Sequence, residues 1–382
     1  MFERAMKHLA LAALLLTGCY QRHGLDAARD AGTDAGCVEL LREDGGTITA
    51  ERVDLLLMVD GSNSMSEEQE SLRVALPGMV RALSSGDVDF DGEPEFPPVA
   101  SLRLGVVTAD MGTGGFVVPT CERSRFGDDG ILTTGDPSCG VPHPRFITYG
   151  EGTWRGPDDF ADAAGCAMSV GTGGCGFEQQ LESVLKAVTP STSPLRFFDG
   201  SRGNADRRNE GFVRPDSVLV VILVTDENDC SALDPELYRA DGGPYGHTDL
   251  NARCFVHADA LHPITRYADG LLALRRDDPG RLVFATIAGI PPSLESRGED
   301  AILADPSMQE VPDPLMPTRL RPSCDVPGRG VAFPPTRLVE VGREIGRGGG
   351  RTIHLSICEE DFTPAVRLIL TEVGRAIRPR CR

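Results

Sequence analysis

Lysine is nearly absent from this chain of 382 residues, since Lys7 and Lys186 are the only two. Arginine supplies almost all of the positive charge, and acidic side chains outnumber it, so the formal net charge is −19. A chain without a basic excess lacks the electrostatic attraction on which nucleic-acid binding depends, and we expect no nucleic-acid partner. Beyond the N-terminal segment no apolar run is long enough to predict a transmembrane helix.

Motifs that indicate catalysis are missing as well. The sequence contains no Gly-x-Ser-x-Gly elbow, no His-Glu-x-x-His pair and no phosphate loop ending in Gly-Lys-Thr. It has no Cys-x-x-Cys pair, which argues against a zinc ribbon or a thioredoxin-type site. His247, His257 and His262 occur near Asp249 and Asp259, but their spacing does not match a zinc enzyme. We therefore expect a protein that is not an enzyme, with a hydrolase as one alternative.

The N-terminus has the features of an export signal. Arg4 and Lys7 precede the apolar run Leu9–Leu16, which is too short to span a bilayer. The run continues into Leu16-Thr-Gly-Cys19, which resembles the bacterial lipobox, and this resemblance implies a lipid on Cys19. The alternative is an ordinary cleaved signal peptide. We expect a membrane-anchored protein of the cell envelope, at the periplasmic face or the cell surface and in the outer membrane.

Cysteine usage supports export. Of eleven cysteines, ten remain once Cys19 is assigned to the lipid, and an even number suits disulfides in an oxidising compartment. Sequence does not determine connectivity, but one arrangement of five pairs would staple the long loops and join the tether to the chain end: Cys166–Cys175, Cys121–Cys139, Cys230–Cys254, Cys324–Cys358 and Cys37–Cys381. Each unstrained bridge would stabilise the fold by about 2–4 kcal/mol.

Short apolar runs separated by helical patterns organise the rest of the chain. A nearly continuous apolar run is typical of a strand buried on both faces. Such runs lie at Val53–Val59, Leu102–Val107, Val218–Val224, Leu282–Ile287 and Ile353–Ile357. Helical patterns lie between them, the first with Ser66 as its N-cap and Gln69 completing a capping box. This alternation predicts an α/β fold with a doubly wound, mostly parallel, Rossmann-like sheet flanked by helices.

The predicted domain organisation has three parts. They are a signal peptide at 1–18, a polar tether at 19–50 and one folded domain at 51–382. Within the domain, three stretches without regular apolar pattern are expected to be long loop insertions stapled by disulfides, at about 109–170, 227–256 and 291–335.

Polar side chains follow two of the predicted strands. Val59 leads into Asp60-Gly-Ser62-Asn-Ser64, and Val224 leads into Thr225-Asp226. Asp-x-Ser-x-Ser after a buried strand resembles the metal-ion-dependent adhesion site (MIDAS) of von Willebrand factor A domains, and Asp226 stands where that family places a further aspartate. The resemblance implies that these four residues hold Mg²⁺, or else Mn²⁺ or Ca²⁺, and that the metal binds a protein partner.

One position departs from the family pattern. The threonine that the family places in a glycine loop is replaced by Cys175, and a soft sulfur suits magnesium poorly. Thr172 and Glu178 are the nearby side chains that would compensate. The departure leaves open a second function, a structural envelope protein that keeps the fold without the metal.

An acidic loop at Asp87, Asp89 and Asp91 resembles the start of a calcium loop. An EF-hand requires a glutamate at its twelfth position, where this chain has Pro98, although Glu93 and Glu95 offer carboxylates nearby. We expect an acidic surface turn here.

Overall fold

A computed structural model describes residues 52–135, 144–150, 156–295, 297–327 and 330–377. These residues belong to a single unit, Thr47–Pro379. The predicted signal peptide, the tether and the cysteines at 19, 37, 139 and 381 lie outside the described residues. None of the helices in the described ranges is both long and apolar enough to span a bilayer.

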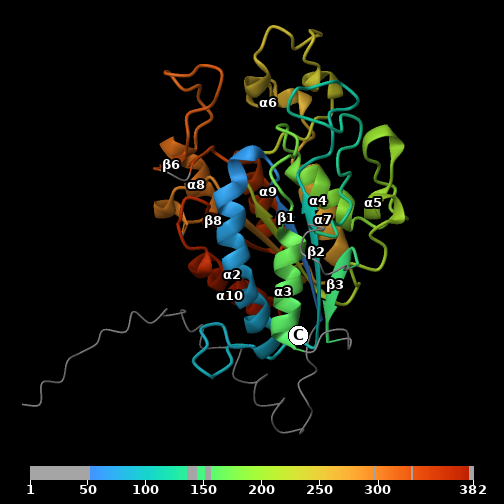
Figure 1. Ribbon diagram of the computed structural model, residues 1–382, viewed down its shortest axis with the longest axis vertical. Coiled ribbons are helices and arrows are strands. Elements are labelled where there is room, and N and C mark those ends of the chain that lie inside the picture. Colours follow the sequence, from blue (N-terminus) through green and yellow to red (C-terminus); the bar gives the residue numbers. More distant parts are fainter. Residues whose placement is uncertain (1–51, 136–143, 151–155, 296, 328–329, 378–382) are drawn as a thin grey trace, which may run out of the picture. The chain divides into compact units, whose positions relative to one another are not determined.

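A six-stranded sheet forms the centre of this unit (Figure 1). Its strand order is β3-β2-β1-β4-β5-β8, and all neighbours are parallel except β3, which runs antiparallel to β2. The predicted mostly parallel α/β fold is therefore confirmed. The strands are β1 (Arg52–Val59), β2 (Ser101–Thr108), β3 (Phe146–Tyr149), β4 (Val218–Val224), β5 (Leu282–Ala288) and β8 (Arg351–Ser356), with a separate hairpin of β6 (Cys324–Val326) and β7 (Gly330–Ala332).

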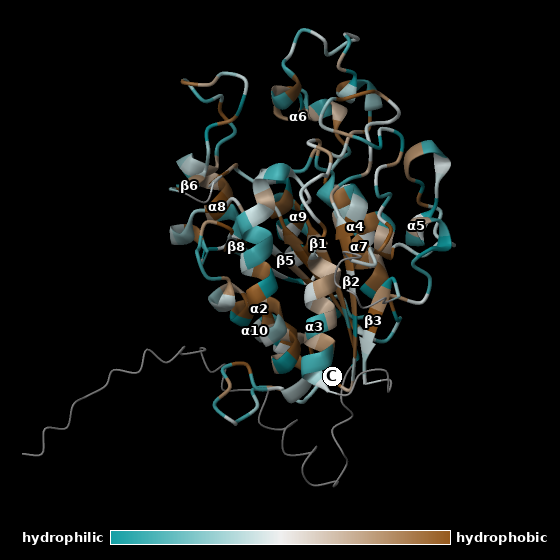
Figure 2. Ribbon diagram, viewed as in Figure 1, coloured by the Kyte–Doolittle hydropathy of each residue, from teal (hydrophilic) through white to brown (hydrophobic). Residues whose placement is uncertain are grey.

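Helices cover both faces of the sheet. The α-helices are α2 (Ser66–Ser85), α3 (Pro157–Met168), α4 (Gln180–Val188), α5 (Gly203–Arg207), α6 (Arg253–Val256), α7 (Thr265–Leu272), α8 (Glu299–Ala304), α9 (Thr336–Arg347) and α10 (Thr363–Ile377). Odd-numbered side chains of β1, from Val53 to Val59, pack with α2, α3 and α10, whereas Leu56 and Met58 pack with α4, α7 and α9. The apolar residues therefore lie between two helical layers (Figure 2).

The stretch 109–170 contains more regular structure than its sequence pattern suggested. It includes the edge strand β3 and helix α3, which packs against α2. Strand β3 is only four residues long, and α3 is rich in alanine, so neither produces a strong apolar period. Helix α3 begins with Pro157, a residue suited to the first turn because its missing N–H has no intrahelical partner there.

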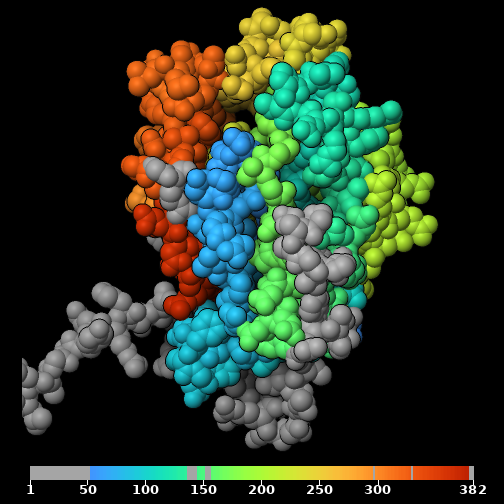
Figure 3. Space-filling view, viewed as in Figure 1, coloured from blue at the N-terminus to red at the C-terminus, as the bar shows by residue number. Residues whose placement is uncertain are grey.

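Loops gather beyond the carboxyl ends of the parallel strands, where a third, smaller core holds them together. That core joins side chains from around residues 118–121, 175–177, 230–238 and 260–261. In the space-filling view, the yellow region near residue 250 and the orange region near residue 315 lie at this end of the molecule, above the start of α2 (Figure 3).

Helix α4 buries a charged side chain. Lys186 has no exposed surface, forms an ion pair with Asp129 and donates to the Ser201 hydroxyl at 2.7 Å. Its ammonium also lies 5.9 Å from the centre of the Phe197 ring. Burial of this charge is tolerated because a carboxylate and a hydroxyl replace the lost water.

Candidate metal site

The two polar strand ends lie side by side at the carboxyl edge of the sheet. Strands β1 and β4 are parallel neighbours in which Val59 pairs with Val224, so Asp60 and Thr225 follow at the same level. The Asp60 amide donates to the Val224 carbonyl at 3.0 Å and continues the ladder one residue further. This edge is where open α/β sheets place their binding sites.

Asp60 is buried, and both of its carboxylate oxygens accept hydrogen bonds. The Thr225 hydroxyl donates to Oδ2 at 2.6 Å and the Ser62 amide donates to Oδ1 at 2.8 Å. Gln180 donates in turn to the Thr225 hydroxyl at 3.0 Å. Burial raises the pKa of Asp60, while the bonds from Thr225 and Ser62 oppose that shift. These contacts fix the orientation of the Asp60 loop.

The two serine hydroxyls converge beside this carboxylate. Ser62 Oγ and Ser64 Oγ are 3.1 Å apart, and the Ser64 hydroxyl lies within hydrogen-bonding reach of the Asp226 carboxylate. Ser62 is buried and Ser64 is exposed. The four residues expected from the sequence to hold the metal, Asp60, Ser62, Ser64 and Asp226, are thus brought together at one point of the fold.

Asp226 has the least satisfied side chain of these four residues. The residue is only 5% exposed, and its buried Oδ1 atom has no hydrogen-bond partner. Burial, followed by the negative charges of Asp60 and Glu227, raises the pKa of Asp226 to about 8. A buried carboxylate oxygen without a donor is costly unless a proton or a cation satisfies it. The hard oxygen donors at this point suit Mg²⁺, Mn²⁺ or Ca²⁺.

Two glutamates extend the acidic cluster. Glu178 is buried just before α4, and Glu227 follows Asp226 and is partly buried. The two carboxyl groups lie within hydrogen-bonding reach of each other. Burial raises the pKa of Glu227 to about 7, helped by the charge of Asp60, and burial and the charge of Glu227 raise that of Glu178 well above its usual value. Across the described ranges, no arginine or lysine forms an ion pair with any of these acids.

Glu227 is the member of this cluster that sequence reasoning missed. The signal was present in the run Asp226-Glu-Asn-Asp229, where a buried strand ends in three acids within four residues. Glu178 was expected only as a substitute ligand, and it lies close enough for its charge to interact with those of Asp60 and Asp226.

A glycine-rich loop packs directly against the Asp60 loop. The Gly174 amide donates to the Gly61 carbonyl at 2.7 Å, and Gln69 donates to the carbonyls of both Asp60 and Gly171 at 2.9 Å. A Cβ atom on Gly174 would lie 2.7 Å from the Gly61 oxygen, which explains the need for glycine. Thr172 is partly buried in this loop, and in the described structure no hydrogen bond joins it to Asp60, Ser62 or Ser64.

Cys175 forms a disulfide with Cys121, with a Cα–Cα distance of 4.2 Å. The predicted pairs Cys166–Cys175 and Cys121–Cys139 are therefore wrong. The loop that carries Cys121 and the loop that carries Cys175 meet beyond the strand ends, although 54 residues separate the two cysteines in the sequence. Cys166 is also disulfide-bonded. The predicted pairs Cys230–Cys254 and Cys324–Cys358 are confirmed. The Cys175 sulfur is thus held in a disulfide instead of serving as a free thiolate.

The histidines expected to mark an alternative hydrolase site are held by separate contacts. His257 Nε2 lies 2.8 Å from the Thr248 hydroxyl, and its ring stacks edge-on with that of His247 at 5.4 Å. His262 packs against Tyr267, and burial lowers the pKa of His262. Within the described ranges these three histidines do not gather with acids into a metal-ligand group.

The acidic loop after α2 does form such a group. Carboxylate oxygens of Asp87, Asp89, Asp91 and Glu95 all lie within 4.8 Å of one another. The amides of Gly92, Asp91 and Val88 donate to three of them, as in an ordinary acidic turn. This loop follows the far end of α2 and is separate from the Asp60 site.

No family model matches the chain, and no curated protein matches it. Similar solved structures include proximal thread matrix protein 1 from the mussel byssus (13% identity, TM-score 0.29) and the same protein with zinc in its MIDAS motif (13%, TM-score 0.27). Each match covers 63% of this chain and 38% of that one. A mutant of the PilB minor pilin from Streptococcus sanguinis is 8% identical at a TM-score of 0.37, over 87% and 62% of the two chains. The chain thus spans less than two thirds of the length of these proteins, and at such TM-scores we draw nothing from the likeness.

Proposed function

We propose that this chain is a lipid-anchored protein of the cell envelope whose von Willebrand factor A-like domain binds a protein partner through a divalent metal. The metal site consists of Asp60, Ser62, Ser64 and Asp226. The observation that supports it best is the unpartnered, buried Oδ1 of Asp226 beside two serine hydroxyls and the Asp60 carboxylate. We place the anchor on Cys19 and the protein at the periplasmic face or the surface of the outer membrane.

Each residue of the site has a distinct task in this proposal. Asp60 already accepts hydrogen bonds on both oxygens and therefore orients the loop and contributes negative charge. Ser62 and Ser64 offer neutral hydroxyl ligands, and Asp226 offers its free Oδ1. When bound, the metal would supply a positive centre with room for a carboxylate of the partner, because two of its ligands are neutral hydroxyls.

Calorimetry with Mg²⁺, Mn²⁺ and Ca²⁺ tests the metal site. We expect Asp60→Ala and Asp226→Ala to weaken binding by at least about tenfold, as removal of groups that ligate or orient a metal does. Asp277→Asn is the control, because it removes one exposed charge distant from the strand ends.

Capture of the protein partner from membranes should be lost when a chelator removes the metal. Equal metal affinity in wild type and both alanine variants would contradict the proposal.

A second function, a metal-free structural protein of the envelope, is favoured by one observation. The position at which the family has threonine is held in the Cys121–Cys175 disulfide. This alternative expects no heat of binding with any of the three cations in the wild-type protein. The same calorimetry therefore separates the two proposals.

A further inference from the structure

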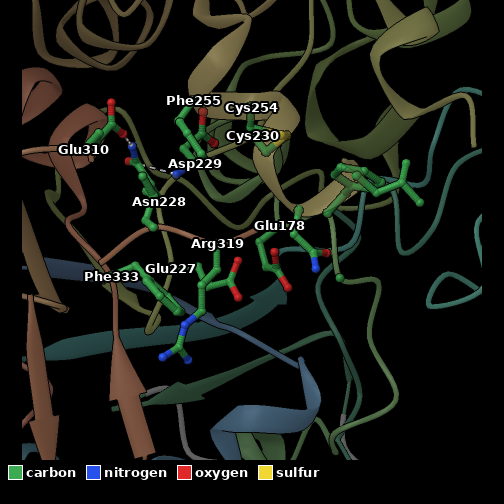
Figure 4. Close-up of a pocket in the computed structure, with 15 residues that line it drawn as sticks. Glu178, Glu227, Asn228, Asp229, Cys230, Cys254, Phe255, Glu310, Arg319 and Phe333 are labelled. Carbon is green, nitrogen blue, oxygen red and sulfur yellow. Dashed lines mark hydrogen bonds between the residues drawn. A yellow bond between two sulfur atoms is a disulfide. The ribbon is translucent and has the colours of Figure 1, made fainter. Parts of the chain in front are cut away.

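A cavity of about 290 Å³ lies beside the candidate metal site and shares two residues with the acidic cluster. Glu178 and Glu227 line it, together with side chains that belong to three segments far apart in the sequence, near residues 250–255, 310–320 and 333 (Figure 4). A space of this size is far larger than a metal ion requires, since one water occupies about 30 Å³. It can hold a side chain of a bound protein.

The carboxyl groups of the three cavity glutamates have no basic partner in the described structure. Glu178 is 3% exposed, and its carboxyl meets another acid, Glu227, instead of a basic group. Glu310 accepts hydrogen bonds only from neutral groups, Asn228 at 2.6 Å and the Thr336 hydroxyl at 3.0 Å. In the part of the chain that the structure describes, no ion pair involves these three glutamates.

The basic residues near the cavity are already engaged. Arg319 donates twice to Asp313, at 3.1 and 2.9 Å. Arg337 pairs with Asp229 at 3.1 Å, and Asp229 also accepts from the Ser231 hydroxyl. Neither arginine is therefore paired with Glu178, Glu227 or Glu310, and a cation that enters the cavity meets carboxyl groups without a basic partner.

Apolar side chains complete the walls. Phe255 belongs to α6 and Leu250 to the helical turn just before it, and Leu320 and Phe333 come from the segments on either side of the β6–β7 hairpin. An acidic interior with aromatic and aliphatic walls complements a long side chain that has an apolar stem and a cationic end. Lysine and arginine have this form, and aromatic faces add an attraction for the cation.

The geometry favours an organic cation over a second metal ion. Within the described residues, the only group of three or more acid, histidine or cysteine side chains with ligand atoms in mutual reach is the loop of Asp87 to Glu95. Glu178, Glu227 and Glu310 do not converge in this way. Glu310 lies apart from the Glu178–Glu227 pair (Figure 4), so a multivalent hydrogen-bond donor can reach more than one carboxyl group along the cavity wall.

We propose that this cavity receives a lysine or arginine side chain of the protein partner, next to the partner carboxylate at the metal. The inference rests on the proposed function, because the shared residues Glu178 and Glu227 place the two subsites side by side. It specifies the partner's chemistry as an acidic residue and a basic residue close together on one surface.

Isothermal titration of the full chain with Nα-acetyl-arginine N-methylamide, without added metal and again in excess MgCl₂, tests the cavity. The neutral control ligand is Nα-acetyl-norleucine N-methylamide, which keeps the aliphatic stem. We expect the arginine probe to bind at least about tenfold more tightly, and Glu310→Gln to remove most of that difference, as loss of one charged hydrogen bond does. Asp277→Asn, the charge-matched control, should bind as wild type does. Leu250→Trp, which fills the cavity, should abolish binding.

Three results would overturn the inference. They are equal binding of the arginine and norleucine probes, wild-type affinity in both Glu310→Gln and Leu250→Trp, or complete displacement of the arginine probe by excess Mg²⁺, which would assign the glutamates to a second metal. The blocked probe has no carboxylate, so its binding does not depend on the metal. Failure of Mg²⁺ to bind while the arginine probe binds would defeat only the proposed function.

Discussion

Asp54 is the single charged residue inside the apolar run of β1, and its surroundings explain how a carboxylate is tolerated there. It has no exposed surface, and it accepts from the Arg214 side chain at 2.8 Å, the Arg214 amide at 2.6 Å and the Ser217 hydroxyl at 2.6 Å. Arg214 also donates to the Ser101 hydroxyl. These bonds join the amino ends of three strands on the side of the sheet opposite the candidate site.

We expect Asp54→Ala to lower the free energy of unfolding by about 3–5 kcal/mol, because the change leaves the Arg214 guanidinium buried without its partner. Asp216→Ala is the control. Asp216 pairs with Arg52 at 2.8 Å, but both side chains are more than half exposed, so the loss should stay below about 1 kcal/mol. Urea unfolding followed by circular dichroism measures both, and similar losses in the two variants would contradict this reading of the pair.

Among the helices, α2 has the most direct link to the candidate site, through Gln69 in its first turn. The sequence predicted a capping box in which Ser66 caps the helix and Gln69 returns the bond. That prediction was wrong: Ser66 is already the first helical residue and its hydroxyl donates to Glu67. Gln69 donates instead to Asp60 and Gly171, so one amide group joins the two loops of the site.

Gln69→Ala is expected to weaken Mg²⁺ affinity by about tenfold, since two hydrogen bonds of about 0.5–1.5 kcal/mol each then no longer hold the loops together. Gln309→Ala is the matched control, because the Gln309 amide also donates to two backbone carbonyls, those of Leu303 and Asp305, but on an exposed surface. The measurement is calorimetric titration of both variants. An equal effect of the two changes would show that Gln69 does not position the loops.

The sequence allowed the main strands to be found, and it singled out four polar residues that meet at the strand ends, because a buried parallel strand is almost continuously apolar and its polar carboxyl end stands out. Short or alanine-rich elements such as β3 and α3 leave no comparable pattern. The Cys121–Cys175 disulfide and the approach of Glu178 to Glu227 depend on how loops that are far apart in the sequence pack against one another. Local sequence patterns do not indicate such long-range packing, so neither contact could be predicted.

At the scale of the whole molecule, the acidic cluster makes stability depend on pH. The pKa of Asp226 is raised from 3.8 to about 8 and that of Glu227 from 4.5 to about 7, chiefly by burial. The unfolded chain releases these protons near its lower values, while the native protein retains them. Between these limits the native state binds more protons, and stability therefore falls as the pH rises.

We expect the melting temperature of the metal-free protein to fall as the pH rises from about 4.5 to about 8 and then to level off. Mg²⁺ should restore stability most at pH 8, where the carboxylates are ionised and available to the cation. The double variant Asp226→Asn, Glu227→Gln is the control and should lose both effects. Melting temperatures across this range, with and without MgCl₂, provide the test, and a wild-type stability that rises over the same window would contradict the assignment of charge.

The burial of Lys186 gives the fold a chemical reporter of its own. It is the sole lysine among the described residues, and the segments that carry Asp129, Phe197 and Ser201 cover its amine. An acylating reagent can reach this nitrogen only while these segments are transiently displaced from α4. The rate at which Lys186 is modified therefore measures how often the domain opens there, with no label introduced and no residue changed.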